Sequence, residues 1–236
     1  MADAKKIIRL NYKAYLADMD DKLYDTTDAE AAKEAGLFNE EYTYAPMAYM
    51  VGSKALFPDL DEAISNAEIG KEVEVTIPCE KAAGPKNPKL IELHPVKEFY
   101  KQEINPYPGM NVSLGNKTGV VMSVGAGRVK VDFNNPLAGH DLMYRFTVTE
   151  EITDNNEKAK AIMEMAFGSS EGFEFDIQAD KVVITEAEIC KFHQNWAVAK
   201  YKIVTDFREA FGVDRVDFLQ VWDAAKKDDK KDDKKE

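Results

Sequence analysis

The residue types that usually carry acid–base, nucleophilic or metal chemistry are scattered along this chain. Its three histidines, His94, His140 and His193, have neither the i, i+4 spacing nor the cysteine companions of a zinc site, and His140 is expected to be solvated. The glycines of residues 124–127 are typical of a hairpin turn, too far from a helix start to hold a phosphate. The one Gly-x-Ser-x-Gly match, at 168–172, stands between an expected helix and an expected strand and not at the strand-to-helix turn of a nucleophile elbow. Any chemistry must therefore proceed without a strong nucleophile, a strong acid–base pair or a metal.

Residues 131–148 carry the most specific pattern in the chain. Val131 and Phe133 alternate with polar neighbours, and Asn134-Asn135-Pro136 follows as turn chemistry, because Asn bonds its own backbone and Pro fixes φ. Alternation resumes after the turn. The residues alone predict strand, tight turn and strand, which an ordinary hairpin would also satisfy.

Composition limits the classes of partner. The chain has 236 residues, a net charge of −12 and an isoelectric point near 4.9, which argues against nucleic acid or an anionic membrane as partner. Its two cysteines, Cys79 and Cys190, cannot build a disulfide framework and are expected to be packed residues. No stretch has the length of a signal peptide core or a membrane span, which predicts a cytoplasmic protein.

Hydrophobic periodicity and helix signals predict mixed α and β structure in the first part of the chain. Residues 28–37 favour a helix, with Asp28 as N-cap and Gly36 as stop. The strand at 142–148 is expected to pair with 73–77, around an intervening segment. The full set of expected elements before that segment is strands at 5–17, 22–25, 46–52 and 69–78 and helices at 28–37 and 56–66.

The later parts of the chain read as two further regions and a tail. Prolines punctuate residues 87–134, where short strands at 90–93, 111–114, 119–124 and 128–133 predict a compact all-β insert. Residues 152–223 show the order α-β-β-α-β of a small two-layer sandwich. Their expected elements are a helix capped by Asp154 and ending near Phe167, a hairpin of 173–177 and 181–185, a helix at 196–211 and a strand at 213–222. Residues 224–236 alternate blocks of Lys and Asp and predict a disordered tail.

The stretch 131–148 also closely resembles the closing element of an FKBP-type peptidyl-prolyl isomerase of the SlyD-like kind. There the pattern VDxNxPLAGxxLxYxxxV marks the return from an insert to the last strand. Four upstream motifs resemble the same family in the same order: NYKAYL at 11–16, KLYDTT at 22–27, PMAYMVG at 46–52 and LFPDLDEA at 56–63. This shared order makes the ordinary hairpin the weaker interpretation.

The resemblance implies an α+β fold with three domains. Residues 1–86 plus 135–151 would form an antiparallel half-barrel wrapped on a short helix, the isomerase domain. Residues 87–134 would form the inserted small all-β domain, which in this family binds unfolded chains. Residues 152–223 are similar, by position and element order, to the extra C-terminal α/β sandwich domain of long-type archaeal members, and residues 224–236 would be the charged tail.

The resemblance also supplies the site. The family isomerises X–Pro bonds in an apolar pocket lined by aromatic rings, and Asp25 matches the acid of that pocket. An acid among apolar residues is expected to have a polar partner. Singly, each apolar match could be an ordinary core residue, but their joint order favours a site. The matching positions are Tyr12, Tyr24, Asp25, Met47, Leu56, Phe57, Leu60, Leu137 and Tyr144.

Two positions depart from the family pattern. The loop Pro78–Gly84 has Ala83 where the family often has a Tyr that donates to the substrate carbonyl. Asp59 replaces the common Gly before Leu60. Both changes favour weak turnover of small peptides and argue against macrolide binding.

The remaining regions suggest partners. By resemblance, the insert would contact unfolded chains, although its apolar residues could equally form its own core. The helix at 196–211 carries Trp196, Ile203 and Phe207, which could form a homodimer surface or the core of the C-terminal domain. The expected client contacts in the insert are Leu90, Ile91, Val96, Phe99, Tyr100 and Tyr107.

Together these observations lead us to expect a cytoplasmic, archaeal long-type, SlyD-like peptidyl-prolyl cis-trans isomerase (rotamase) with chaperone function in protein folding. Its substrates would be unfolded or partly folded polypeptides with X–Pro bonds, and it would need no cofactor. The main alternative is a non-catalytic holdase on the same fold, which Ala83 favours. A β-barrel adaptor with no preference for proline is a third.

Overall fold

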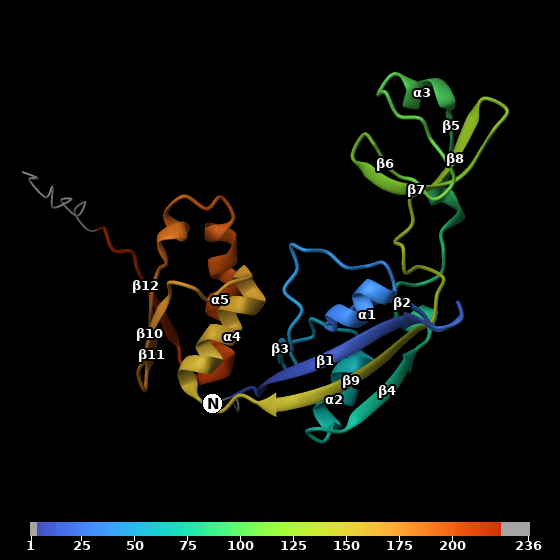
Figure 1. The fold of residues 1–236 in the computed structure, drawn as a ribbon. Coiled ribbons are helices and arrows are strands. Elements are labelled where there is room, and N and C mark those ends of the chain that lie inside the picture. The colour runs from blue at the N-terminus through green and yellow to red at the C-terminus, as the bar shows by residue number, and fades with distance from the viewer. Residues whose placement is uncertain (1–3, 223–236) are drawn as a thin grey trace, which may run out of the picture. The chain divides into compact units, whose positions relative to one another are not determined.

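The computed structural model describes residues 4–222, so the predicted tail at 224–236 lies outside the described residues. These residues divide into two compact units. One unit contains residues 4–10, 47–52 and 149–222, and the other contains 11–46 and 53–148. Both units mix helices and strands (Figure 1), as the α+β prediction requires.

A five-stranded sheet has the strand order β2-β1-β9-β4, with β3 also paired to β1. The pairings β1–β2, β1–β3 and β4–β9 are antiparallel. The predicted pairing of 142–148 with 73–77 is confirmed, because Val73 lies opposite Phe146 and Ile77 opposite Leu142. The bounds of the five strands are β1 Ile7–Leu16, β2 Lys22–Thr26, β3 Met47–Met50, β4 Glu72–Ile77 and β9 Leu142–Glu151.

Two short helices accompany this sheet. Helix α1 (Ala29–Glu34) begins as predicted at Asp28, whose carboxylate accepts hydrogen bonds from the backbone N–H groups of Glu30 and Ala31. Helix α2 (Pro58–Asn66) packs against β4, and its buried residues Leu60 and Ile64 stand one turn apart. Because Pro58 occupies the first turn, α2 starts directly after Phe57. The start of α2 therefore fixes the position of the Phe57 backbone.

The insert contains a four-stranded sheet in the order β5-β8-β7-β6. It also contains a helix that the sequence analysis did not expect, α3 (Val96–Tyr100). Phe99 of this helix is completely buried at the centre of a small core that it forms with Val112, Val121, Val129 and Val131. The strands are β5 Ile91–Pro95, β6 Asn111–Leu114, β7 Lys117–Gly125 and β8 Arg128–Asp132.

The C-terminal region has the predicted order α-β-β-α-β. Helix α4 (Asn155–Phe167) begins at Asp154, which accepts from the Glu157 N–H, and α5 has the predicted bounds Trp196–Phe211. The strands β10 (Glu174–Ile177) and β11 (Lys181–Thr185) are antiparallel, and β12 (Arg215–Leu219) joins β11 in parallel. Three short 3-10 helices complete the described elements: η1 Cys79–Lys81, η2 Pro88–Leu90 and η3 Glu188–Lys191.

The aromatic residues of α5 serve the core of their own unit. Trp196 is 5% exposed, and Ile203 and Phe207 are 0% exposed. The ring of Trp196 lies 5.6 Å from that of Phe173, and the ring of Phe207 lies 6.0 Å from that of Phe175. The expectation that these side chains form a dimer surface was therefore wrong. They pack on the β10–β11 hairpin, as the alternative expected. Self-association stays a prediction.

No helix within residues 4–222 is both long and apolar enough to span a membrane. In the same range, no group of three or more His, Cys, Asp or Glu side chains is arranged to hold a metal ion. Both cysteines are free thiols. Burial of Cys190 raises the pKa of its thiol to about 11, which keeps it protonated as a packed residue.

Candidate functional site

Three aromatic rings from separate segments of the chain surround the ring of Tyr144 on β9. Its ring centroid lies 6.4 Å from that of Tyr12 on β1, 6.3 Å from that of Tyr24 on β2, and 6.4 Å from that of Phe57 before α2. These are ordinary spacings for interacting aromatic rings. All four side chains are partly buried. We call Tyr12, Tyr24, Phe57 and Tyr144 the aromatic cluster.

The sheet explains how Tyr24 reaches this cluster. Ala14 on β1 lies opposite Asp25 on β2, but the next residue, Tyr15, lies opposite Leu23. Tyr24 is therefore an extra residue on β2 without a partner on β1, which is the definition of a β-bulge. A bulge bends the strand locally and turns the side chain of the extra residue in a new direction.

Three hydrogen bonds order the polar atoms of the cluster. The Tyr12 hydroxyl donates to Oδ2 of Asp25 at 2.8 Å, while Oδ1 of Asp25 accepts from the Thr26 N–H at 2.9 Å. The Tyr24 hydroxyl donates to the Tyr144 hydroxyl at 2.6 Å. Asp25 thus has the polar partners that the sequence predicted, and the cluster contains neutral donors held in fixed positions.

The tyrosine hydroxyls of the cluster stay protonated. Burial, followed by the hydrogen bond to Asp25, raises the pKa of Tyr12 well above its ordinary value. Burial and the hydrogen bond to Tyr144 raise the pKa of Tyr24 further still. Burial also raises the pKa of Tyr144, against the opposing effect of the bond from Tyr24. These groups therefore act as hydrogen-bond donors and not as bases or nucleophiles.

We expect these raised pKa values to make the protein less stable at high pH. In the unfolded chain a tyrosine releases its proton near pH 10, whereas Tyr12 and Tyr24 hold theirs in the folded state. The stability that they contribute is complete below pH 10 and is lost as the pH rises toward their folded pKa values. Between pH 9 and pH 11.5, the melting temperature of Tyr24→Phe should fall less steeply than that of the unmodified chain, by about a third, because Tyr12 and Tyr144 still hold their protons.

Tyr42→Phe is the matched control for that measurement, because Tyr42 is 69% exposed. The same slope of melting temperature against pH for the unmodified chain and for Tyr24→Phe would contradict the expectation.

The other residues predicted for the site carry no aromatic ring, and the structure locates them by their elements and burial. Leu56 is partly buried beside Phe57, and Leu60 is 3% exposed on α2. Met47 is partly buried on β3, opposite Leu10. Leu137 is partly buried in the turn before β9, where its N–H donates to Oδ1 of Asn135 at 2.9 Å. Their membership of the site stays a prediction.

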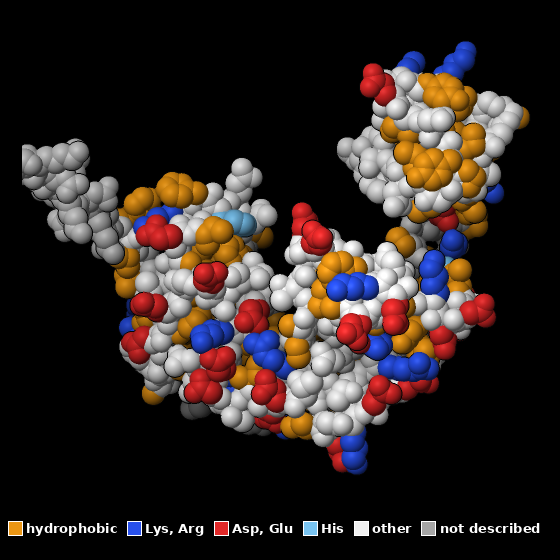
Figure 2. All heavy atoms as spheres, in the orientation of Figure 1, with side chains coloured by type: hydrophobic (Ala, Val, Ile, Leu, Met, Phe, Trp, Pro, Cys, Tyr) orange, Lys and Arg blue, Asp and Glu red, His pale blue; other side chains and the backbone are white. Residues whose placement is uncertain are grey.

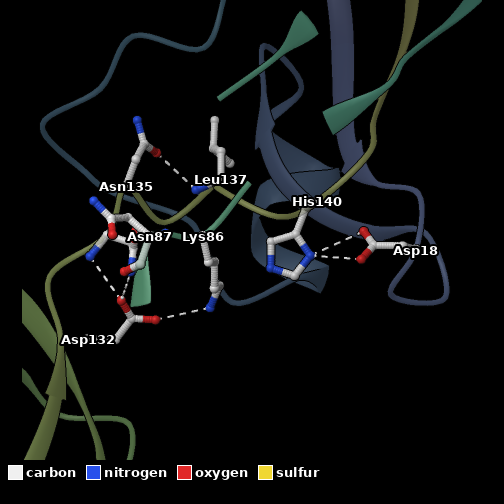
Figure 3. A network of polar contacts seen from close by, with 8 residues as sticks. Asp18, Lys86, Asn87, Asp132, Asn135, Leu137 and His140 are labelled. Atoms are coloured by element: carbon white, nitrogen blue, oxygen red, sulfur yellow. Dashed lines mark hydrogen bonds and ion pairs between the residues drawn. The ribbon is translucent and has the colours of Figure 1, made fainter. Parts of the chain in front are cut away.

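Figure 3 shows a polar network at the base of the insert that the sequence analysis missed. Asp132 accepts from Lys86 Nζ at 3.1 Å and from the backbone and side-chain nitrogens of Asn134 at 2.9 and 2.7 Å. Asn87 and Asn134 bind each other twice, N–H to side chain at 2.8 Å and side chain to carbonyl at 3.1 Å. Burial alone would raise the pKa of Asp132, but these donors lower it. The network ties together the two chain segments that enter and leave the insert.

His140 is not solvated as expected. Its side chain is 18% exposed, and its Nδ1 lies 2.9 Å from Oδ2 of Asp18 (Figure 3). The bond to His140 lowers the pKa of the Asp18 carboxyl. His140 therefore fastens the turn before β9 to the turn after β1.

The residues of the insert that were predicted to contact clients differ in how exposed their side chains are. Phe99 is 0% exposed and belongs to the insert core, so it was wrongly expected to face clients, and Leu90, Ile91 and Val96 are only partly exposed. Tyr100 and Tyr107 are 57% and 62% exposed. Hydrophobic side chains gather on the face of the insert that Figure 2 shows. Further exposed apolar residues that the sequence analysis missed are Leu93, Met122 and Val124.

Comparisons with known proteins place these features in context. Residues 92–137 match a family model described as FKBP26, IF domain, and residues 155–223 match one described as FKBP26 C-terminal. A short-type peptidyl-prolyl cis-trans isomerase of Methanocaldococcus jannaschii is 32% identical over 136 residues, 58% of this chain and 87% of the relative. The FKBP-type isomerase SlyD of Helicobacter pylori is 27% identical over 139 residues, 51% of this chain and 74% of the relative. An FKBP-type 16 kDa isomerase of Escherichia coli is 26% identical over 133 residues, 55% of this chain and 84% of the relative.

Proposed function

The chain belongs to the FKBP-type peptidyl-prolyl cis-trans isomerases, with SlyD-like relatives and a C-terminal extension, and we propose that the aromatic cluster is its catalytic site. It is therefore an isomerase with polypeptide substrates. The observation that carries the site is the meeting of Tyr12, Tyr24 and Phe57 around Tyr144, beside an ordered carboxylate. This is an apolar surface with fixed donors and no strong acid or base.

Such a surface suits the isomerisation of an X–Pro bond. The uncatalysed barrier of about 18–20 kcal/mol is largely the loss of amide resonance on twisting. The twisted amide has less charge separation than the planar amide, so an environment poor in water favours it. No covalent bond to the protein is needed, which fits a cluster whose hydroxyls remain protonated.

We assign separate roles to the members of the site. The rings of Tyr12, Tyr24, Phe57 and Tyr144 hold the proline ring, and Asp25 positions Tyr12 through their hydrogen bond. Leu56, Leu60 and Leu137 would complete the apolar walls, and the role of Met47 stays a prediction. These assignments are supported by the ring contacts for the first group and by sequence position for the second.

The insert would deliver protein clients to this site. Tyr100, Tyr107 and Leu93 are each more than half exposed on a domain with a small core of its own. Exposed apolar groups of this kind favour binding of extended, unfolded chains, and they give the isomerase a chaperone function. The same surface would serve the alternative, a holdase without turnover.

The test of catalysis is NMR exchange spectroscopy on an Ala-Leu-Pro-Phe peptide. We expect the cis–trans exchange rate of the Leu–Pro bond to rise with protein concentration, because the cluster lowers the barrier to twisting. An exchange rate unchanged at stoichiometric protein would contradict the catalytic site and favour the holdase. Prevention of aggregation of an unfolded client, measured on the same sample, would then be the remaining activity.

A further inference from the structure

The hydroxyl protons of the aromatic cluster are not all used within the protein. Tyr12 donates its proton to Asp25, and Tyr24 donates its proton to the Tyr144 oxygen. The Tyr144 hydroxyl accepts that bond and still carries a proton of its own. Among residues 4–222, no acceptor for this proton is found. A partly buried tyrosine hydroxyl usually finds a hydrogen-bond partner, so this donor is available to a bound molecule.

We infer that the Tyr144 hydroxyl donates its free proton to a backbone carbonyl of the substrate next to the X–Pro pair. The inference deepens the proposed function and rests on it. Tyr144 is the hub of the ring contacts, so a proline held among the rings brings its neighbouring peptide groups within reach of this hydroxyl. An extended peptide offers carbonyl acceptors on both sides of the proline.

The chemistry of rotation selects the neighbouring carbonyl and not the oxygen of the amide that twists. In the planar amide, resonance places negative charge on the oxygen, and twisting removes it. A donor on that oxygen would stabilise the planar state more than the twisted state and slow the reaction. A neighbouring carbonyl keeps its charge throughout, so the bond from Tyr144 is equally strong in both states and contributes to substrate binding.

Tyr24 fixes the direction of this donor. Because Tyr24 occupies one lone-pair direction of the Tyr144 oxygen at 2.6 Å, the Tyr144 proton must point elsewhere. Burial keeps that proton in place by raising the pKa of Tyr144. Tyr24 is therefore a positioning residue for the donor, while Tyr144 contacts the substrate.

Two single substitutions distinguish the effect of the Tyr144 donor from the effect of the hydrogen bond between Tyr24 and Tyr144. Tyr144→Phe removes the hydroxyl and keeps the ring, whereas Tyr24→Phe breaks the same pair but leaves the Tyr144 donor in place. With the Ala-Leu-Pro-Phe peptide, we expect Tyr144→Phe to raise KM by roughly three- to tenfold, the loss of one neutral hydrogen bond. Its kcat should stay within about twofold of the unmodified chain. Tyr24→Phe should raise KM by less, and the double variant should match Tyr144→Phe.

The outcomes distinguish this inference from its alternatives. Equal rises in KM for the two single variants would overturn it, because the pair would then act as a structural unit. A lower kcat with an unchanged KM would also overturn it, since this indicates a smaller folded fraction or a donor on the twisting amide. If the unmodified chain does not accelerate exchange, the proposed function fails and the inference fails with it. If the unmodified chain is active and neither variant changes KM, only the inference fails.

Discussion

Tyr144→Ala is expected to lower kcat/KM for isomerisation of a proline tetrapeptide by about two orders of magnitude. The substitution removes the ring that Tyr12, Tyr24 and Phe57 all contact. It also leaves the Tyr24 hydroxyl without its acceptor. Loss of the apolar surface and its donor together should cost roughly 3 kcal/mol of transition-state stabilisation, or about a hundredfold in rate. Exchange spectroscopy on the tetrapeptide measures this directly.

Tyr15→Ala is the matched control for this substitution. Tyr15 is also a partly buried tyrosine of the same sheet, but its ring faces the Arg145 guanidinium at 5.3 Å and takes no part in the cluster. We expect it to lower stability while leaving the rate per folded molecule within about threefold. Equal loss of rate in both variants would mean that the cluster is not the site.

Asp25→Leu gives an independent arm of the same test. It deprives the Tyr12 hydroxyl of its acceptor and the Thr26 N–H of a partner. We expect a smaller loss than for Tyr144→Ala, of roughly tenfold, because the rings remain and only their order is disturbed. Unchanged rates in both Tyr144→Ala and Asp25→Leu would contradict the assignment of the site.

Replacement of residues 87–134 by a short glycine-containing turn is expected to separate the two proposed activities. The ends of the insert lie close together, because the Gly139 N–H donates to the Gly84 carbonyl at 2.8 Å outside the replaced segment. A short turn can therefore close the chain, and the entropy of loop closure changes only slowly with loop length. The shortened protein should unfold cooperatively and keep its rate on the tetrapeptide within a fewfold.

The same replacement should reduce catalysis of the refolding of a proline-limited protein by roughly a hundredfold. The insert would hold a client near the site, and a second binding surface raises the effective concentration by about that factor. The measurement is the slow refolding phase of the client, followed by fluorescence. Equal losses on the tetrapeptide and on the protein client would contradict a division of labour between insert and site.

A double substitution in the full-length chain controls for damage caused by the deletion. Tyr100→Lys with Tyr107→Lys changes two side chains that are 57% and 62% exposed and leaves the insert core around Phe99 intact. It should reproduce much of the loss of refolding catalysis on the protein client. The isomerisation rate on the tetrapeptide, which Tyr144→Ala is expected to lower, should not change. Full refolding activity in this variant would place client binding elsewhere.

Much of the fold could be predicted from local sequence signals. Asp28 and Asp154 were identified as N-caps because a short acceptor precedes a run of helix formers, and both bind the N–H groups of their first turns. Helix α5 has the predicted bounds because apolar residues recur with helical spacing from Trp196 to Phe211, and Gly212 follows as the C-cap. The α3 helix was missed, since a helix of five residues directly after Pro95 carries too little periodic pattern to be recognised.

The aromatic cluster was predictable only in its membership. Tyr12, Tyr24, Phe57 and Tyr144 were named from motifs that lie far apart in sequence, and the structure brings their rings together. The network around Asp132 was missed, although the pattern Asp132-x-Asn134 was its signal. Short polar side chains at a turn could bind either locally or across the chain, and sequence alone does not say which.

The sequence by itself determined where most helices and strands form, because those depend on periodicity, caps and turn residues within a few positions of each other. The order of its motifs along the chain determined which family it resembles. Only the tertiary structure decided that Tyr24 is the extra residue of a bulge and that its hydroxyl meets Tyr144, 120 positions away. It also decided that Phe99 is buried while Tyr100 beside it is exposed. Each of these depends on strand register and side-chain direction, which the packing of distant segments sets and which no local pattern encodes.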